Sequence, residues 1–414
     1  MRAQSAERHP TAGPEGQGQD TPGTGPALAA AVDTDVVGAV NGELARCCED
    51  FASLSRSLDA VFAGDIAERL CAYTLGGGAR IRPQLLWWAL RACGGRDAET
   101  PAALRVAAAL ELIQSCALIH DDIMDRSAER RGRPSFHAQI ALRHTAHGEE
   151  ADPGAFARSA AVLAGDLALS WADDLVAGAD LAATVRPHIL RIWRLMRTEM
   201  VAGQYLDLHG QATSSRSAVQ AIRTVCLKTA RYTVERPLAL GAALAGADET
   251  TARALTAAGR CAGVAFQLRD DLLDVFGDPK ATGKPAGDDI RSGKATYLLA
   301  VAHSRAHAVG ATNVIDLLDD CRGSADLSEA ALSSVRDALR STGAPAQVER
   351  RIRRLAQAAR FHLAAARLRG PAARHLAELL TAVASPPGEA AAPPPALDGH
   401  QAPPALAGHE GGVR

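Results

Sequence analysis

Apolar residues recur at helical spacing through the middle of the chain, and no strand pattern competes with them. From about residue 35 to residue 384 the sequence is rich in Ala and Leu and poor in aromatic residues, which favours helix nearly throughout. Residues 101–125 are apolar on every side until His120, which is typical of a central helix in a bundle. We therefore predict an all-α fold, a single large helical bundle around a central cavity that the polar end of this helix faces.

Gly and Pro mark the predicted helix ends. Breaks are expected at Gly76-Gly77-Gly78, Gly94-Gly95, residues 144–154, Gly277-Asp278-Pro279 and Gly343-Ala344-Pro345. Helix starts are expected at Arg82-Pro83 and Thr100-Pro101, because Pro suits the first helical position. The segments 1–34 and 385–414 hold too few large apolar residues to offset the entropy of ordering, so we predict disordered tails around one domain at 35–384.

Charge and cysteine content narrow the class of protein. The 414 residues carry a formal net charge of -2, so no global basic field attracts nucleic acid or an acidic membrane, and any anion site must be local. The eight cysteines are scattered without zinc spacing, which indicates free thiols in a reducing compartment. Neither a signal peptide nor a transmembrane segment is evident, so we expect a cytoplasmic protein with no nucleic-acid partner.

Two acidic clusters interrupt the apolar pattern. They share the spacing i, i+1, i+4 and are formed by Asp121, Asp122 and Asp125, and by Asp270, Asp271 and Asp274. Carboxylates this close on a helix repel one another unless a cation lies between them, and oxygen ligands suit Mg²⁺. One such cluster could be a solvated helix end, but a solvated face has no reason to repeat the pattern. Two facing clusters predict a metal cage for a diphosphate.

The ordered motifs over most of residues 70–300 resemble the all-trans isoprenyl diphosphate synthase (polyprenyl synthetase) family, most closely a geranylgeranyl diphosphate synthase. The blocks that carry the resemblance are GGGARIRP, DDIMD, RRGRPS, GDLAL, GQYLDL, KTA, DDLLD, GKPAGDD and GKAT. The resemblance implies an isoprenoid synthase-type fold, a homodimer, and about three Mg²⁺ ions held by the six aspartates. It also implies two substrates, isopentenyl diphosphate and an allylic diphosphate.

Individual roles follow from the same resemblance. The allylic diphosphate would be bound by Arg130, Lys228, Lys284 and Lys294. Lys228 would also act in catalysis, together with Thr229 and Gln267. Isopentenyl diphosphate would be bound by Arg80, Arg82, Gln114 and Arg131. Each residue has an ordinary structural alternative, such as a solvated helix cap for the arginine pair or a satisfied buried amide for either glutamine.

The sequence departs from the family pattern at Ala79, where a lysine normally contacts isopentenyl diphosphate. Losing one charged hydrogen bond predicts binding weaker by about 1.5 to 3 kcal/mol unless another group compensates.

Product length should depend on the space below the first cluster. The residues one turn towards the core are Cys116 and Ala117, with Ile113 a turn deeper, and none of them is a bulky aromatic. We therefore predict head-to-tail (1'-4) condensation to a C20 all-trans prenyl diphosphate, with a longer polyprenyl or a C15 product as alternatives. A class I terpene cyclase on the same fold and a non-catalytic partner subunit are two further hypotheses.

Overall fold

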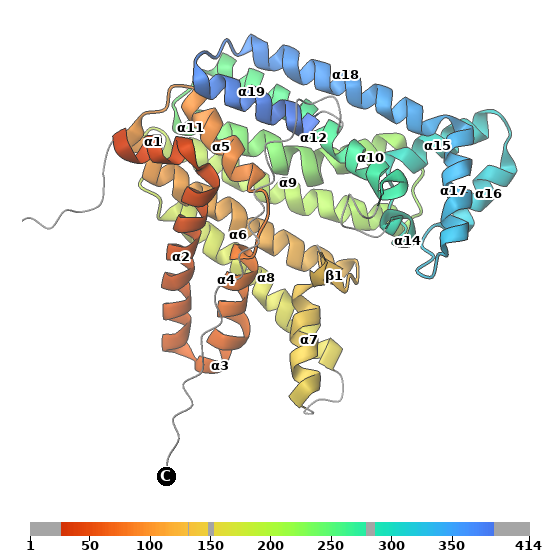
Figure 1. Cartoon of the computed structure of the whole chain (residues 1–414), viewed down its shortest axis with the longest axis horizontal. Helices are drawn as coiled ribbons and strands as arrows, with labels where there is room; N and C mark the ends of the chain where they lie inside the picture. The colour runs from red at the N-terminus through yellow and green to blue at the C-terminus, as the bar shows by residue number, and fades with distance from the viewer. Residues whose placement is uncertain (1–25, 131, 148–152, 279–285, 385–414) are drawn as a thin grey trace, which may run out of the picture.

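The computed structural model describes residues 26–130, 132–147, 153–278 and 286–384, and nearly all of them are helical. Figure 1 shows long helices side by side in the body of the molecule. The predicted all-α class is confirmed. Within the described residues the sole sheet is a hairpin of two-residue strands, which pairs Glu129 with Pro134 and Arg130 with Arg133.

The first half of the chain forms elements whose boundaries follow the Gly and Pro breaks. They are α1 (Pro26–Thr34), α2 (Val36–Leu58), α3 (Ala60–Phe62), the π-helix η1 (Ala63–Ala67), α4 (Glu68–Leu75), α5 (Ile81–Ala92), the 3₁₀ helix η2 (Asp97–Glu99), α6 (Thr100–Met124), β1 (Glu129–Arg130), β2 (Arg133–Pro134), α7 (Phe136–His147) and α8 (Pro153–Ala177). Figure 1 shows the α2 to α4 segment and α7 projecting from one side of the body.

The second half contributes the rest of the bundle. Its elements are α9 (Arg186–Ala212), α10 (Ala218–Val225), the π-helix η3 (Cys226–Glu235), α11 (Arg236–Leu244), α12 (Glu249–Phe276), α14 (Asp288–Arg291), α15 (Tyr297–Ala308), α16 (Thr312–Cys321), α17 (Glu329–Thr342), α18 (Ala344–Ala365) and α19 (Pro371–Ala384). Gly343 ends α17 with a φ of 69°, a conformation that glycine adopts without a steric penalty.

Helix α6 is the predicted central helix. It is apolar on all sides and packs against α5 and α8, and side chains such as Leu110, Leu112 and Ile113 are fully buried. Among the described residues, Asp97–Met124 is the one helical stretch long and apolar enough to cross a membrane, and 78% of its most apolar window is buried inside the fold. Burial against neighbouring helices accounts for its apolar composition.

The prediction that residues 1–34 form a disordered tail is wrong for its last part, because Pro26–Thr34 forms helix α1. Ala29 and Val32 are buried against the core. Asp33 accepts hydrogen bonds of 3.0 Å from Trp87 and Arg91 of α5. Small apolar residues and one polar anchor therefore order a segment whose composition alone predicted disorder. The rest of both predicted tails, 1–25 and 385–414, lies outside the described residues.

Candidate active site

The first acidic cluster lies where α6 leaves the core. Asp122 is fully buried, and Arg130 of the β1 strand donates to it from Nε at 2.7 Å and to Asp121 from Nη2 at 3.3 Å. Burial raises the pKa of Asp122, and it raises the pKa of Asp125 as well. Burial also acts on Asp121, but the nearby cations, Lys228 foremost, outweigh it and lower its pKa. Among the described residues, the cations therefore outweigh the effect of burial on the pKa at only one of the three carboxylates.

Lys228, on the π-helix η3, links this cluster to α9. Its Nζ donates to Asp121 at 3.0 Å and to Asp207 at 2.7 Å. The two helices approach closely because Gly203 of α9 has no side chain; a Cβ there would lie 2.6 Å from the Cα of Lys228. Burial would lower the pKa of the Lys228 ammonium, but Asp207 and Asp121 outweigh burial and raise it. Lys228 is therefore a protonated group at the edge of the cluster.

Lys294 connects the first cluster to the second. Its Nζ lies 3.2 Å from Asp125 Oδ2 and 3.3 Å from Asp289 Oδ1. The backbone N–H of Asp289 in turn donates to Asp274 Oδ2 at 3.1 Å. Burial would lower the pKa of Lys294, yet the carboxylates of Asp289 and Asp125 raise it well above its usual value. One ammonium group thus ties the end of α6 to α14.

The second acidic cluster lies near the end of α12 and is oriented by a short hydrogen-bond chain. The Thr229 hydroxyl donates to Gln267 Oε1 at 2.8 Å, and Gln267 Nε2 donates to Asp271 Oδ1 at 2.8 Å. Asp271 is buried, whereas Asp270 is exposed. The structure therefore brings the predicted catalytic pair together and connects it directly to this cluster.

The carboxylates fit a magnesium site that the substrate completes. Asp122 Oδ2 and Asp125 Oδ1 are buried without a hydrogen-bond partner in the described part of the chain. Burial and the neighbouring Asp289 carboxylate raise the pKa of Asp274 to about 7. Within the described residues, however, no three Asp, Glu, His or Cys side chains converge on one metal position. The predicted cage is thus not closed by protein ligands alone, which agrees with the preference of Mg²⁺ for a few carboxylates plus waters and phosphate oxygens.

A second group of polar residues surrounds Arg82. Its guanidinium stacks 4.5 Å from the Tyr232 ring centroid, and its Nη2 donates to Thr233 at 2.8 Å. The Tyr232 hydroxyl donates to Gln114 Oε1 at 2.9 Å. Burial raises the pKa of Tyr232, so the phenol stays neutral and remains a donor. The structure therefore joins Arg82 to Gln114 through an aromatic residue that the sequence interpretation did not single out.

Arg80 lies apart from that group. Its buried guanidinium donates to Glu111 at 2.6 Å, to Asn41 at 2.9 Å and to the Thr74 carbonyl at 2.9 Å. The residue has a left-handed backbone, with a φ of 49°. The interpretation of Arg80 as a ligand of isopentenyl diphosphate is not supported by this position, because its donors are used inside the protein. We assign it a structural role.

Two further predicted ligands, Arg131 and Lys284, lie outside the described residues. Ala79 is exposed on the loop before α5. Of the four predicted ligands of the allylic diphosphate, the described residues therefore include Arg130, Lys228 and Lys294.

The predicted chain-length residues line up on α6 below the first cluster. Ile113 and Cys116 are buried and Ala117 is half-buried. The Cys116 Sγ lies 3.8 Å from His120 Nδ1, and burial raises the pKa of the thiol to about 12. His120 Nε2 lies 3.2 Å from the Val162 carbonyl of α8, so this histidine packs between the two helices.

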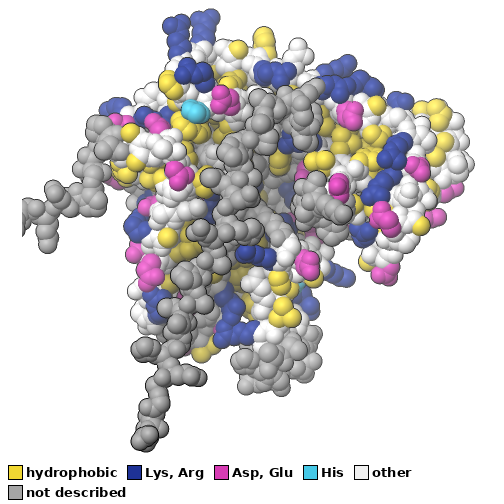
Figure 2. All heavy atoms as spheres, in the orientation of Figure 1, with side chains coloured by type: hydrophobic (Ala, Val, Ile, Leu, Met, Phe, Trp, Pro, Cys, Tyr) yellow, Lys and Arg dark blue, Asp and Glu magenta, His cyan; other side chains and the backbone are white. Residues whose placement is uncertain are grey.

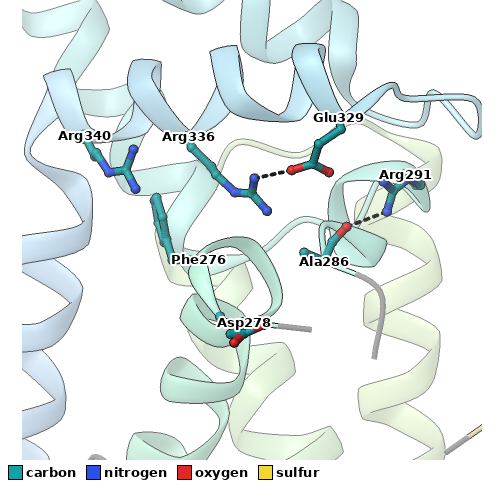
Figure 3. A pocket seen from close by; sticks show the side chains of 8 residues that line it. Phe276, Asp278, Ala286, Arg291, Glu329, Arg336 and Arg340 are labelled. Atoms are coloured by element: carbon teal, nitrogen blue, oxygen red, sulfur yellow. Dashed lines mark hydrogen bonds and ion pairs between the residues drawn. The ribbon is translucent and has the colours of Figure 1, made fainter. Parts of the chain in front are cut away.

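An open pocket of about 580 Å³ lies just beyond the second cluster, at the end of α12 (Figure 3). Arg336 of α17 donates from Nε to the Val275 carbonyl at 2.7 Å and from Nη1 to Glu329 at 2.6 Å. Arg291 donates to the Ala286 carbonyl at 2.6 Å. Its arginines bind the backbone carbonyl groups of Val275 in α12 and of Ala286 just before α14.

Sequence reasoning missed four residues of this site. They are Gln204, which donates to Asp121 at 3.0 Å, and Asp207, Tyr232 and Asp289. Gln204 and Asp207 lie in the GQYLDL block and Asp289 in the GKPAGDD block, so the motifs that contain them were visible. The partners of Gln204, Asp207 and Tyr232 were not, because these contacts join separate helices. Asp289 pairs with nearby Lys294, but its backbone contact with Asp274 of α12 was not visible either.

Comparison with known proteins agrees with this geometry. A model of the family described as polyprenyl synthetase matches residues 65–334. A geranylfarnesyl diphosphate synthase from Aeropyrum pernix is 33% identical over 258 residues, which cover 62% of this chain and 74% of that protein. A farnesyl diphosphate synthase from Geobacillus stearothermophilus is 35% identical over 265 residues, 61% of this chain and 82% of that one.

A solved structure of a geranylgeranyl pyrophosphate synthase from Corynebacterium glutamicum, complexed with isoprenyl diphosphate and magnesium, is similar over 83% of this chain and 97% of its own. It superposes with a TM-score of 0.80 at 38% identity. The family match spans well over half of the chain and includes both acidic clusters as well as Arg130, Lys228 and Lys294. The chain belongs to the polyprenyl synthetase family.

Proposed function

We propose that this prenyl diphosphate synthase joins isopentenyl diphosphate to allylic diphosphates, head to tail, to give an all-trans C20 prenyl diphosphate. The observation that carries the proposal is the pair of acidic clusters on α6 and α12, with Lys228 bound to Asp121 and Lys294 bound to Asp125 of the first cluster. Arg82 and the polar residues around it supply the second diphosphate site that a condensation of two diphosphates needs.

The allylic diphosphate is bound between the clusters. Arg130, Lys228 and Lys294 are the described cations that face it, and the aspartates hold Mg²⁺, about three ions by family resemblance. When bound, Mg²⁺ neutralises the diphosphate and stabilises its negative charge as the leaving group. The ammonium groups of Lys228 and Lys294 add positive charge at the same place.

Thr229 and Gln267 stabilise the allylic carbocation, which is the other product of ionisation. The Thr229 hydroxyl proton is committed to Gln267, so the lone pairs of its oxygen are free to face a carbocation. The C–O bond of the allylic diphosphate breaks, and the double bond of isopentenyl diphosphate supplies the electron pair for the new C–C bond. The cation that this leaves on the isopentenyl unit loses a proton from its C2 carbon to the released diphosphate, which forms the double bond of the product. The protein needs no nucleophile for this sequence.

Tyr232 should support isopentenyl diphosphate binding, because it contacts both Arg82 and Gln114. Tyr232→Phe removes the hydroxyl but keeps the ring, so we expect KM for isopentenyl diphosphate to rise about 3- to 10-fold. Tyr232→Leu also removes the cation–π contact and should raise KM further. Steady-state kinetics with each substrate varied in turn checks this. A matching rise in KM for the allylic substrate would show a general distortion instead.

Product length is predicted to respond to the residue at position 116. Its thiol is buried one turn below the first cluster, so Cys116→Phe places a ring where the growing chain would pass. We expect products of C15 or shorter in place of C20, measured by sizing the dephosphorylated alcohols. Val219→Phe, at a position 78% exposed on α10, is the matched control and should leave the length unchanged. Unchanged length in the Cys116 variant would place the floor of the pocket elsewhere.

Two alternatives use the same fold. A class I terpene cyclase would need no isopentenyl diphosphate site, and Ala79 is the observation that favours it. A non-catalytic partner subunit would need neither acidic cluster, and both are complete here. Incubation with labelled isopentenyl diphosphate and each of the C5, C10 and C15 allylic diphosphates separates the three hypotheses. Elongation supports the synthase, a hydrocarbon from the allylic substrate alone supports the cyclase, and activity only after addition of a second protein supports the subunit.

We also propose that the protein is a cytoplasmic homodimer. All eight cysteines are free thiols, which suits a reducing compartment. Helix α8 exposes Leu163 at 64% and Val162 at 43%, apolar groups suited to contact with a second copy. Light scattering coupled to size-exclusion chromatography measures the mass; a monomer at assay concentration would contradict the dimer.

A further inference from the structure

The outer face of α18 carries arginines that the proposed reaction does not use. Residues 344–384 contain eight arginines and two glutamates, whereas the whole chain has a net charge of -2. Figure 2 shows basic side chains along the edge of the molecule where Figure 1 places α18. Positive charge is therefore concentrated on one helix of an otherwise nearly neutral protein.

These arginines share one side of the helix with an exposed aromatic ring. At about 100° per residue, they fall within a sector of roughly 120°. We call this sector the α18 basic face; it consists of Arg350, Arg353, Arg354, Arg360 and Phe361, all exposed. Phe361 is 72% exposed. The opposite side is buried and packs against α12 through Val348, Ile352, Ala356 and Ala359.

The charges of this face are largely not neutralised within the described residues. Arg353 lies 4.0 Å from Glu349, a distant and exposed pair. Arg350, Arg354 and Arg360 form no ion pair with any described acidic residue. The face therefore remains available to an external polyanion.

We propose that the α18 basic face docks the protein onto an anionic membrane surface. A polybasic row beside an aromatic side chain on an amphipathic helix matches the requirements of such a surface, where each basic residue contributes about 1 kcal/mol. The exposed Phe361 ring favours lipid over nucleic acid, because it can enter the boundary between headgroups and acyl chains. The face lies on the side of α18 that points away from α12, so docking leaves the acidic clusters uncovered. One reason for docking rests on the proposed function, since a prenyl diphosphate product is itself amphiphilic.

Vesicle flotation tests the proposal on the full chain and without substrate, so it does not depend on activity. At about 100 mM salt we expect binding to vesicles of equimolar phosphatidylglycerol and phosphatidylcholine, none to phosphatidylcholine alone, and release as salt rises. The triple variant R350Q/R354Q/R360Q should bind about 100-fold more weakly. Phe361→Ser should lose about 10-fold. Both variants should keep the elongation activity of the unaltered protein in vesicle-free buffer.

A matched variant controls for the change in net charge. R56Q/R96Q/R253Q removes three exposed arginines from α2, from the residue before η2 and from α12, and should bind as the unaltered protein does. Equal binding to the two kinds of vesicle would overturn the proposal, as would undiminished binding by the α18 triple variant. Tighter binding to a mixed-sequence DNA duplex than to anionic vesicles would identify a nucleic-acid surface instead.

Discussion

Replacing Asp121 with Asn should lower kcat for condensation by about 10²- to 10³-fold. Asp121 contacts Lys228, Arg130 and Gln204, and it is the carboxylate of its cluster whose pKa the neighbouring cations lower despite its burial. The amide keeps the shape of the side chain but removes its charge, so the site loses a metal ligand together with the partner that fixes Lys228.

Steady-state rates at saturating concentrations of both substrates give this effect on kcat directly. Asp50→Asn is the matched control, because Asp50 is 67% exposed on α2, and it should leave the rate unchanged. If the Asp121 variant keeps more than about a tenth of the rate, Asp121 is not part of the ionising site.

Replacing Arg80 with Met should lower the free energy of unfolding by about 3 to 5 kcal/mol. The substitution leaves Glu111 buried without its cation, since their side chains are only 3% and 7% exposed. Asn41 and the Thr74 carbonyl lose hydrogen bonds as well. The double variant R80M/E111M replaces the pair with apolar groups of similar size, so it should recover most of the loss.

Urea denaturation of the single and double variants measures these differences. Arg56→Met, at a site 45% exposed on α2, controls for loss of an exposed arginine and should change stability by less than about 0.5 kcal/mol. Unchanged stability of the Arg80 variant, together with a raised KM for isopentenyl diphosphate, would restore Arg80 as a ligand and remove its structural role.

Periodic patterns in the sequence predicted the elements that bury most apolar surface. The apolar run before Asp121 predicted α6, and the repeated spacing of the aspartates predicted two metal-binding helix ends. Helix α1 was missed because its buried face consists of small residues, Ala29 and Val32, which give little periodic signal. Its order depends on Asp33 reaching Trp87 and Arg91, a contact that local sequence does not contain.

Only part of the site could be predicted, again because local sequence does not contain the contacts that the fold makes. Lys228 and Lys294 could be proposed from motif resemblance, but their partners Asp207 and Asp289 emerge only when α9 and α14 meet the clusters. The π-helix η3 also has no simple periodic signature, although it places Lys228, Thr229 and Tyr232 towards the site. The GGGARIRP motif misled in the other direction. It suggested that Arg80 binds substrate, whereas in the fold Arg80 binds Glu111 inside the protein.

The most direct test of the allylic site is calorimetric titration of the protein with an unreactive allylic thiodiphosphate, with and without Mg²⁺. Within the part of the chain that the structure describes, the two clusters are short of cations, as the unpartnered Asp122 and Asp125 oxygens and the raised pKa of Asp274 indicate. We therefore expect micromolar or tighter binding with Mg²⁺, and binding weaker by about 100-fold or more when the metal is chelated. Equal affinity in the two conditions, or no binding in either, would contradict the assignment of α6 and α12 as a metal-dependent diphosphate site.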